Sequence, residues 1–147
     1  METANSEAKT DEAPRILRVA IAGGPGAGKS TAAQRLEEDL GLPVLRTDDL
    51  KDTCEWSELS AVVSGWFDVH RSVIVEGVAT PRALRKWLRR NEGRGTRPCE
   101  WAVWVGYGEG RGPSKKHASM AKGARTVWRE ILPELEKRGV RIMEVTL

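Results

Sequence analysis

The sequence predicts an α/β fold, because short apolar segments alternate along the chain with segments that have helical periodicity. The strand candidates are runs of apolar and β-branched residues at 17–22, 43–46, 72–77, 100–106 and 140–145. The helix candidates between them lie at 31–40, 56–69, 81–90 and 128–138. Strands that alternate with helices are typical of a parallel sheet. A length of 147 residues suits a single domain with one buried core.

A glycine-rich loop follows the first strand candidate and is the most informative stretch of the chain. It reads Gly23-Gly24-Pro25-Gly26-Ala27-Gly28-Lys29-Ser30-Thr31 and matches the phosphate-binding pattern G-x-x-x-x-G-K-[ST]. In this pattern, backbone N–H groups surround a polyphosphate and the lysine reaches its terminal phosphates. A chance glycine-rich turn is the alternative. The strand before the loop and the helix after it favour a phosphate site.

Two adjacent carboxylates, Asp48 and Asp49, follow the second strand candidate. Ligands bind at the carboxyl ends of the strands in open α/β sheets. There the two side chains could supply a base for a substrate hydroxyl or hold a magnesium-bound water. The alternatives are that Asp49 caps the next helix, or that both are solvated loop acids. We favour Asp48 as a catalytic residue that also contacts the substrate.

The third strand candidate ends in Glu76 and Gly77. A carboxylate at the end of a buried strand costs folding free energy unless it has a task. Beside a phosphate loop, that task is to orient a magnesium ion through water or to polarise the attacking group. The sequence therefore predicts a catalytic and metal-binding role for Glu76, with a purely structural carboxylate as the alternative.

Apolar residues recur at helical spacing across 56–69, which predicts an amphipathic helix packed on the core. Trp66 and Phe67 could instead line an acceptor pocket, where an aromatic face would stack on a base. His70 has no carboxylate or second histidine near it in the sequence. It is expected at the surface or as a partner of the helix dipole.

Positive charge gathers in the next helix, for which Thr80 is the predicted N-cap and Pro81 the first residue. Seven basic residues lie within 82–97, against Glu92 alone. Such a run is usually a solvated face. Arg82 directly follows the loop after the third strand, so it is the member that we expect to contact substrate.

Residues 107–125 are rich in glycine and in basic side chains, and we interpret them as a short mobile lid. The cations that could close on transferring phosphates are Arg111, Lys115, Lys116, Lys122 and Arg125. Of these, we assign Arg125 to catalysis and Lys122 to the substrate. An ordinary loop is the alternative. In the helix that follows, Pro133 predicts a kink or a break.

Taken together, these elements resemble the P-loop kinases over residues 15–147. The resemblance rests on the glycine loop, on Asp48-Asp49 and on Val75-Glu76-Gly77. It implies a P-loop NTPase three-layer sandwich with a five-stranded parallel sheet in the order 2-3-1-4-5. It also implies ATP and Mg²⁺ as cofactors.

The same likeness implies roles for single residues. Lys29 would hold the β- and γ-phosphates, and Thr31 would contact the α-phosphate. Ser30 would ligate magnesium, for which Glu76 and Asp49 are further candidates.

The stretch Asp48-Asp49-Leu50-Lys51 looks like the Asp-Asp-x-Arg element of polynucleotide kinases, in which the basic residue grips an acceptor phosphate. Here Lys51 replaces the arginine, and lysine cannot make a bidentate contact. Only about two dozen residues lie between Asp49 and Val73, so the acceptor site is expected to be small or open.

An open, basic site favours ATP-dependent phosphorylation of a hydroxyl on nucleic acid. The favoured example is 5-hydroxymethyluracil in DNA, the acceptor of small phage-type kinases that this chain resembles. One alternative is a kinase of a free nucleoside, nucleotide or other small metabolite. A nucleotide-binding switch that transfers no phosphate is another.

Residues 1–14 carry four acidic side chains and one lysine, and we predict a disordered tail there. Residues 15–147 then carry a net charge of +6, within a total of +3 for the chain. Cys54 and Cys99 lack metal-binding spacing and are expected to be reduced thiols. No apolar run approaches the ~18 residues of a membrane span, and no signal-peptide pattern is present. These features predict a cytoplasmic location, in a bacterial or phage-infected cell.

Overall fold

A computed structural model describes residues 16–147, so the predicted tail at 1–14 lies outside the described residues. The elements in chain order are β1 (Leu17–Gly23), α2 (Lys29–Leu40), β2 (Val44–Arg46), the 3-10 turn η1 (Thr47–Leu50), α3 (Trp56–Val69), β3 (Ser72–Glu76), α4 (Thr80–Arg90), β4 (Trp101–Gly106), the 3-10 turn η2 (Lys115–His117), α5 (Ala118–Lys137) and β5 (Arg141–Thr146).

The five strands form one sheet in the order β2-β3-β1-β4-β5, and every neighbouring pair is parallel. This confirms the predicted architecture, with the strand before the glycine loop in the middle of the sheet. Because the strands are parallel, their carboxyl ends meet at one edge. The register places Glu76 beside Arg46 on one side and beside Ile21 on the other. We call this side of the sheet the carboxyl edge.

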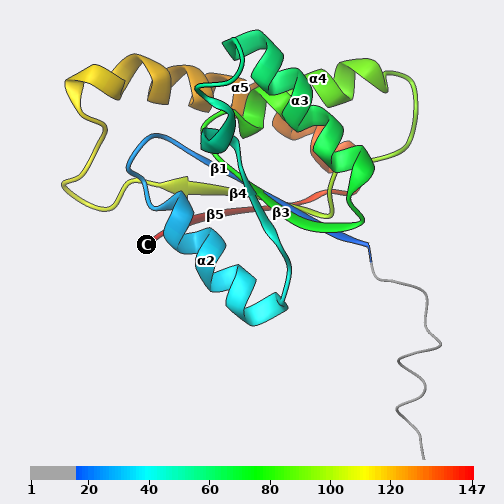
Figure 1. The fold of residues 1–147 in the computed structure, drawn as a ribbon, viewed down its shortest axis with the longest axis horizontal. Helices are drawn as coiled ribbons and strands as arrows, with labels where there is room; N and C mark the ends of the chain where they lie inside the picture. Colours follow the sequence, from blue (N-terminus) through cyan, green and yellow to red (C-terminus); the bar gives the residue numbers. More distant parts are fainter. Residues whose placement is uncertain (1–15) are drawn as a thin grey trace, which may run out of the picture.

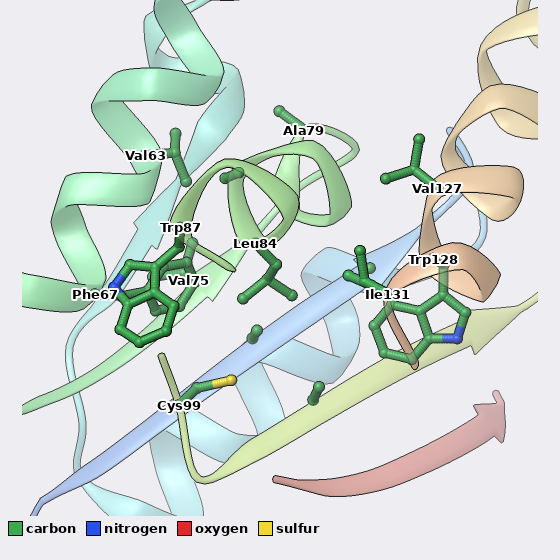
Figure 2. Close-up of a cluster of buried hydrophobic side chains, with 14 of the residues drawn as sticks. Val63, Phe67, Val75, Ala79, Leu84, Trp87, Cys99, Val127, Trp128 and Ile131 are labelled. Carbon is green, nitrogen blue, oxygen red and sulfur yellow. The ribbon is translucent and has the colours of Figure 1, made fainter. Parts of the chain in front are cut away.

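Helices cover both faces of the sheet, which gives three layers. Figure 1 shows α3, α4 and α5 together on one face and α2 on the other. The larger core lies under the three helices, and Figure 2 shows side chains from all three converging above the strands. Its largest members include Phe67, Trp87 and Trp128, each almost fully buried. Burying one such side chain stabilises the fold by roughly 1.5–3 kcal/mol.

The central strands are apolar on both faces because both faces are covered. Trp104 packs with the core under α5, whereas Trp101 packs with the smaller cluster on the α2 side. The two indoles therefore point to opposite faces of the sheet. The α2 side is less completely covered near β5, where Met143 and Leu147 stay exposed.

Two local predictions differ from the structure. Thr80 does not cap α4: the N-cap is Ala79, and the buried Thr80 hydroxyl has no hydrogen-bond partner. No break occurs at Pro133, because α5 runs through it as one helix. The cost of the missing N–H is offset by apolar burial on both sides of the proline, at Ile131 and Leu135.

The predicted lid divides into two parts. Residues 107–114 are irregular, η2 follows, and residues 118–125 form the first two turns of α5. An eight-residue segment of regular helix is less free to move than a glycine-rich loop. The mobility of the irregular part stays a prediction.

Both cysteines are free thiols. Cys99 is fully buried, and burial raises its pKa to about 12, which makes the thiol unreactive. Across residues 16–147, none of the helices has the length and apolar character that crossing a membrane requires.

Candidate phosphate-binding and catalytic site

The glycine loop has the backbone shape that an anion site needs. Gly26 and Gly28 have φ values of 76° and 111°, a region that glycine adopts at little cost. Gly28 is also the N-cap of α2 and leaves the helix without a side-chain cap. The free N–H groups and the dipole of the first turn therefore face the loop and can receive phosphate oxygens.

Lys29 is the buried cation of this site, with 8% of its surface exposed. Its Nζ donates a 2.9 Å hydrogen bond to the carbonyl oxygen of Gly24. An ammonium has three N–H donors, so two are left for a phosphate. Burial lowers the pKa of Lys29, and the charges of Glu76 and Asp48 oppose this shift.

Glu76 is the buried carboxylate of the site, only 5% exposed. Its Oε1 lies 3.3 Å from Arg46 Nε, but this ion pair lacks hydrogen-bond geometry and leaves Oε1 without a hydrogen-bond donor. Burial raises the pKa of Glu76, against the opposing charges of Lys29 and Arg46. The Oε1 atom of Glu76 can therefore accept a hydrogen bond from a further N–H or O–H donor, or bind a cation.

The residues present fit a magnesium ion that is bound together with nucleotide phosphates. Protein sites of that type supply only one or two oxygen ligands and leave water and phosphate to complete the coordination. The unsatisfied Oε1 of Glu76 and the hydroxyl of Ser30, an exposed residue in the first turn of α2, are suitable groups. Among residues 16–147, no cluster of three or more acidic, histidine or cysteine ligands is present, so a metal cage made of protein alone does not fit.

The structure distinguishes the two adjacent aspartates. Both lie in η1 and are exposed. Asp48 contributes to the pKa shifts of both Lys29 and Glu76, whereas Asp49 contributes to neither. Of the two, only Asp48 is therefore close enough to Lys29 and Glu76 for its charge to act on both.

The position of η1 depends on Gly77. This residue has a φ of 153°, and a Cβ there would collide with the side chain of Thr47. Only glycine allows the carboxyl ends of β2 and β3 to approach this closely. The close approach brings Asp48 beside the end of the strand that carries Glu76.

Tyr107 belongs to the site, although sequence reasoning placed it only in the lid. Its hydroxyl donates a 2.6 Å hydrogen bond to the carbonyl oxygen of Pro25 in the glycine loop. It lies so close to Gly24 that a Cβ there would collide with it. Burial raises the pKa of Tyr107. The sequence feature that could have assigned Tyr107 to the site is its position directly after β4, at the carboxyl edge.

Arg125 and Lys122 both line a cavity of about 480 Å³ between α5 and the end of β5, next to Tyr107. Arg125 donates a 3.2 Å hydrogen bond to Glu144 and stacks on Trp104 with its Cζ 4.8 Å from the ring centroid. Its Nη1 is buried without a partner. The predicted lid cation is thus tied to the edge strand here, and Lys122 is exposed.

The two aromatic residues of α3 that could line an acceptor pocket lie with the core, and the acceptor role of Trp66 stays a prediction. Phe67 is fully buried, and Trp66 packs against the same core. The helix rises 1.5 Å per residue, so Trp66 lies about 15 Å along α3 from Trp56, away from η1. The aromatic residue of α3 nearer to η1 is Trp56, which is 42% exposed and faces Arg82. Lys51 is exposed at the end of η1, as an acceptor contact would require.

Acidic side chains pair with three of the four arginines of α4. Arg85 and Arg89 both pair with Glu130, at 2.9 Å and 4.0 Å. Arg90 pairs with Asp68 at 3.3 Å. This run is therefore mostly a solvated, ion-paired surface, and Arg82 stands apart from it.

Comparison with known proteins gives short matches and distant structural likenesses. No family model matches the chain. The adenylate kinases of Mycolicibacterium vanbaalenii and Mycobacterium leprae are 53% and 56% identical to it over 34 residues. Those residues are 23% of this chain and 19% of each relative, so the match spans about a fifth of the relatives' length.

Two solved structures are similar over most of the chain. One is the YorR protein from Bacillus subtilis in complex with phosphorylated GDP, with 14% identity, a TM-score of 0.48, and coverage of 86% of this chain and 84% of that one. The other is an uncharacterized protein from Eubacterium ventriosum, with 14% identity, a TM-score of 0.49, and coverage of 88% and 87%. The fold itself rests on the strand order and on the glycine loop after the central strand: the chain has a P-loop NTPase fold.

Proposed function

We propose that this chain is an ATP-dependent phosphotransferase that uses Mg²⁺ and transfers the γ-phosphate to a hydroxyl acceptor at the carboxyl edge. The observation that carries the proposal is the convergence of three charged groups on one phosphate loop. A buried ammonium, a buried carboxylate and an exposed carboxylate, of Lys29, Glu76 and Asp48, interact there electrostatically. A simple nucleotide-binding switch has no use for Asp48.

Each group has a distinct role in this proposal. The loop N–H groups and Lys29 bind the phosphates, and Lys29 stabilises charge on the transferring group. Ser30 and Glu76 would hold Mg²⁺, with Asp49 as a further candidate; the ion neutralises phosphate charge. Asp48 accepts the proton of the acceptor hydroxyl, whose oxygen bonds to the γ-phosphorus. The bond from that phosphorus to the β–γ bridging oxygen breaks, and ADP leaves with the electron pair.

Two acceptor classes are consistent with this chemistry. One is a hydroxyl on nucleic acid, such as 5-hydroxymethyluracil in DNA, and the other is a free nucleoside, nucleotide or small metabolite. The ion pairs on α4 favour the small acceptor, because paired arginines contribute less to binding a phosphate backbone. The name of the relatives that match in part, adenylate kinase, agrees with a small acceptor.

The test is transfer of labelled γ-phosphate from ATP with Mg²⁺ to a panel of acceptors. The panel holds free nucleosides, nucleoside monophosphates, 5′-hydroxyl oligonucleotides and duplex DNA that contains 5-hydroxymethyluracil. We expect label in a small-molecule lane and none with Lys29→Met. Label confined to a DNA lane would establish the nucleic-acid acceptor instead. ATP binding with no labelled acceptor would favour the nucleotide switch.

A further inference from the structure

Arg82 has an unusual environment for a charged residue of α4. The other arginines of this helix each pair with an acidic side chain, whereas Arg82 has no acidic partner among the described residues. Its side chain is half-buried. Burial, and to a smaller extent the charge of Arg85, lowers the pKa of Arg82. Partial burial of a guanidinium without a counter-charge costs folding free energy. Contacts with neighbouring residues are therefore needed to keep the Arg82 side chain in this position.

Two residues from other helices provide that support. The Cζ of Arg82 lies 5.7 Å from the centroid of the Trp56 ring, within the range of a cation–π contact. On the α5 side, a Cβ added at Gly123 would lie only 2.9 Å from Arg82 Nη2. The guanidinium therefore contacts the indole of Trp56 and has room over α5 because position 123 has no side chain. We call this arrangement the Arg82 slot.

The slot lies near the carboxyl edge, because its three residues come from elements that start there. Trp56 begins α3 soon after η1, and Arg82 lies in the first turn of α4 after β3. Gly123 follows Ala121 in α5 by two residues. The Cβ of Ala121 is 3.0 Å from the position that a Cβ on Gly24 would take. The turn of α5 that contacts Arg82 therefore also packs on the phosphate loop.

We propose that Trp56 and Gly123 are positioning residues, which hold the Arg82 guanidinium toward a substrate phosphoryl group at the carboxyl edge. The proposal rests on the proposed function, in which Arg82 contacts substrate. The phosphoryl group can belong to the γ-position of ATP or to a phosphorylated acceptor, and both offer the same oxygens to a guanidinium. Unlike an ion-paired arginine, Arg82 can meet this group without breaking an existing salt bridge.

Glycine positions allow a matched test. Gly123 and Gly65 are both inside helices, and alanine favours helix at either position. A Cβ at Gly65 would meet nothing within 4 Å, whereas one at Gly123 would meet the end of the Arg82 side chain. Gly123→Ala should displace the Arg82 side chain, and Gly123→Leu should displace it further because leucine is larger. Gly65→Ala and Gly65→Leu are the controls. Trp56→Leu removes the aromatic face, and Trp56→Phe keeps one.

The position of Arg82 can be measured without turnover, by its rate of modification with phenylglyoxal, mapped by peptide mass spectrometry. We expect Trp56→Leu and Gly123→Leu to raise this rate by about threefold or more, the loss expected for one cation–π contact. Trp56→Phe and Gly65→Leu should stay close to the wild-type rate. Equal rates in Gly123→Leu and Gly65→Leu would overturn the slot.

Protection by ligands tests the phosphate role. We expect AMP-PNP with Mg²⁺, or a nucleoside monophosphate, to slow the modification of Arg82 in the wild type and much less in Gly123→Leu. Protection by AMP-PNP assigns the γ-phosphate, and protection by the monophosphate alone assigns an acceptor phosphate. Protection by neither, with AMP-PNP shown by calorimetry to be bound, overturns the positioning role. Absence of AMP-PNP binding in calorimetry would instead contradict the proposed function, while the unliganded rates still decide the slot.

Discussion

The ammonium of Lys29 and the carboxylate of Glu76, both buried at the carboxyl edge, each oppose the pKa shift that burial imposes on the other. Burial outweighs this mutual attraction in both cases: the pKa of the lysine is lowered and that of the glutamate is raised. The two charges are therefore held at a cost to stability, which is common at functional sites. Their placement gives testable consequences for stability and for activity.

Glu76→Gln should stabilise the protein at neutral pH while it lowers phosphotransfer. The folded-state pKa of Glu76 is above its unfolded value near 4.5, so the folded protein resists ionisation. Stability is thus lost as pH rises from about 4.5 through the folded-state pKa, by about 1.4 kcal/mol for each unit by which the two values differ. Thermal melts of both proteins should converge below pH 4.5 and separate above it.

The matched control for that series is Glu136→Gln, an exposed glutamate on α5. It should change the melting temperature little at any pH. A Glu76→Gln variant that is less stable than the wild type at pH 7 would contradict the cost assigned to the buried carboxylate.

Asp48→Asn and Asp49→Asn should separate the two adjacent carboxylates. Removal of a general base typically lowers the rate by about 10²–10⁴, so Asp48→Asn should reduce kcat in that range and leave the Kd for ATP nearly unchanged. Asp49→Asn should reduce kcat by less than about tenfold, because Asp49 shifts the pKa of neither Lys29 nor Glu76. Steady-state kinetics of both variants, with the acceptor identified in the panel, measure these changes in kcat. Equal losses would mean that the two share the role.

Tyr107→Phe should weaken nucleotide binding with little change in the fold. The hydroxyl donates a 2.6 Å hydrogen bond to Pro25 in the phosphate loop. Its loss should cost about 1 kcal/mol, which corresponds to roughly a fivefold rise in the Kd for ATP. Calorimetric titration with ATP and Mg²⁺ measures this change. An unchanged Kd would show that the loop keeps its shape without the tyrosine.

Glu100→Gln should lower stability without affecting catalysis. Glu100 precedes β4, at the sheet edge opposite the site, and accepts hydrogen bonds from the backbone N–H of Arg18 at 2.7 Å and from its Nη2 at 2.8 Å. Burial alone would raise the pKa of Glu100, but the hydrogen bonds from Arg18 outweigh it and lower the pKa.

Because the folded-state pKa of Glu100 lies below its unfolded value, this stabilisation is present above pH 4.5 and is lost as pH falls through the folded-state value. At pH 7 the substitution should cost about 2 kcal/mol of unfolding free energy. Chemical denaturation at pH 7 and in acid measures both effects. A loss of kcat with intact folding would contradict the structural role.

Local sequence patterns predicted the strand, the glycine loop and the helix around Lys29, because each follows from neighbouring residues. Residues adjacent in the sequence are enough to predict the strand, the positive-φ glycines and the start of α2. Contacts with distant segments are not required for any of them. The predicted strand order came from a family resemblance, and the structure confirms it. The place of Glu76 at the end of a buried strand was also readable in sequence, since its neighbours are β-branched.

Contacts between distant segments decided the rest. The close approach of Gly77 to Thr47 sets the position of η1, which carries Asp48 and Asp49, and Tyr107 reaches the loop only because β4 lies beside β1. Acids on α3 and α5 pair with three arginines of α4 and leave Arg82 without an acidic partner among the described residues. The sequence by itself therefore determined the phosphate loop and the strand and helix pattern. The tertiary structure decided which charged side chains lie close together. Charge pairing depends on distances in space, which spacing along the chain does not encode.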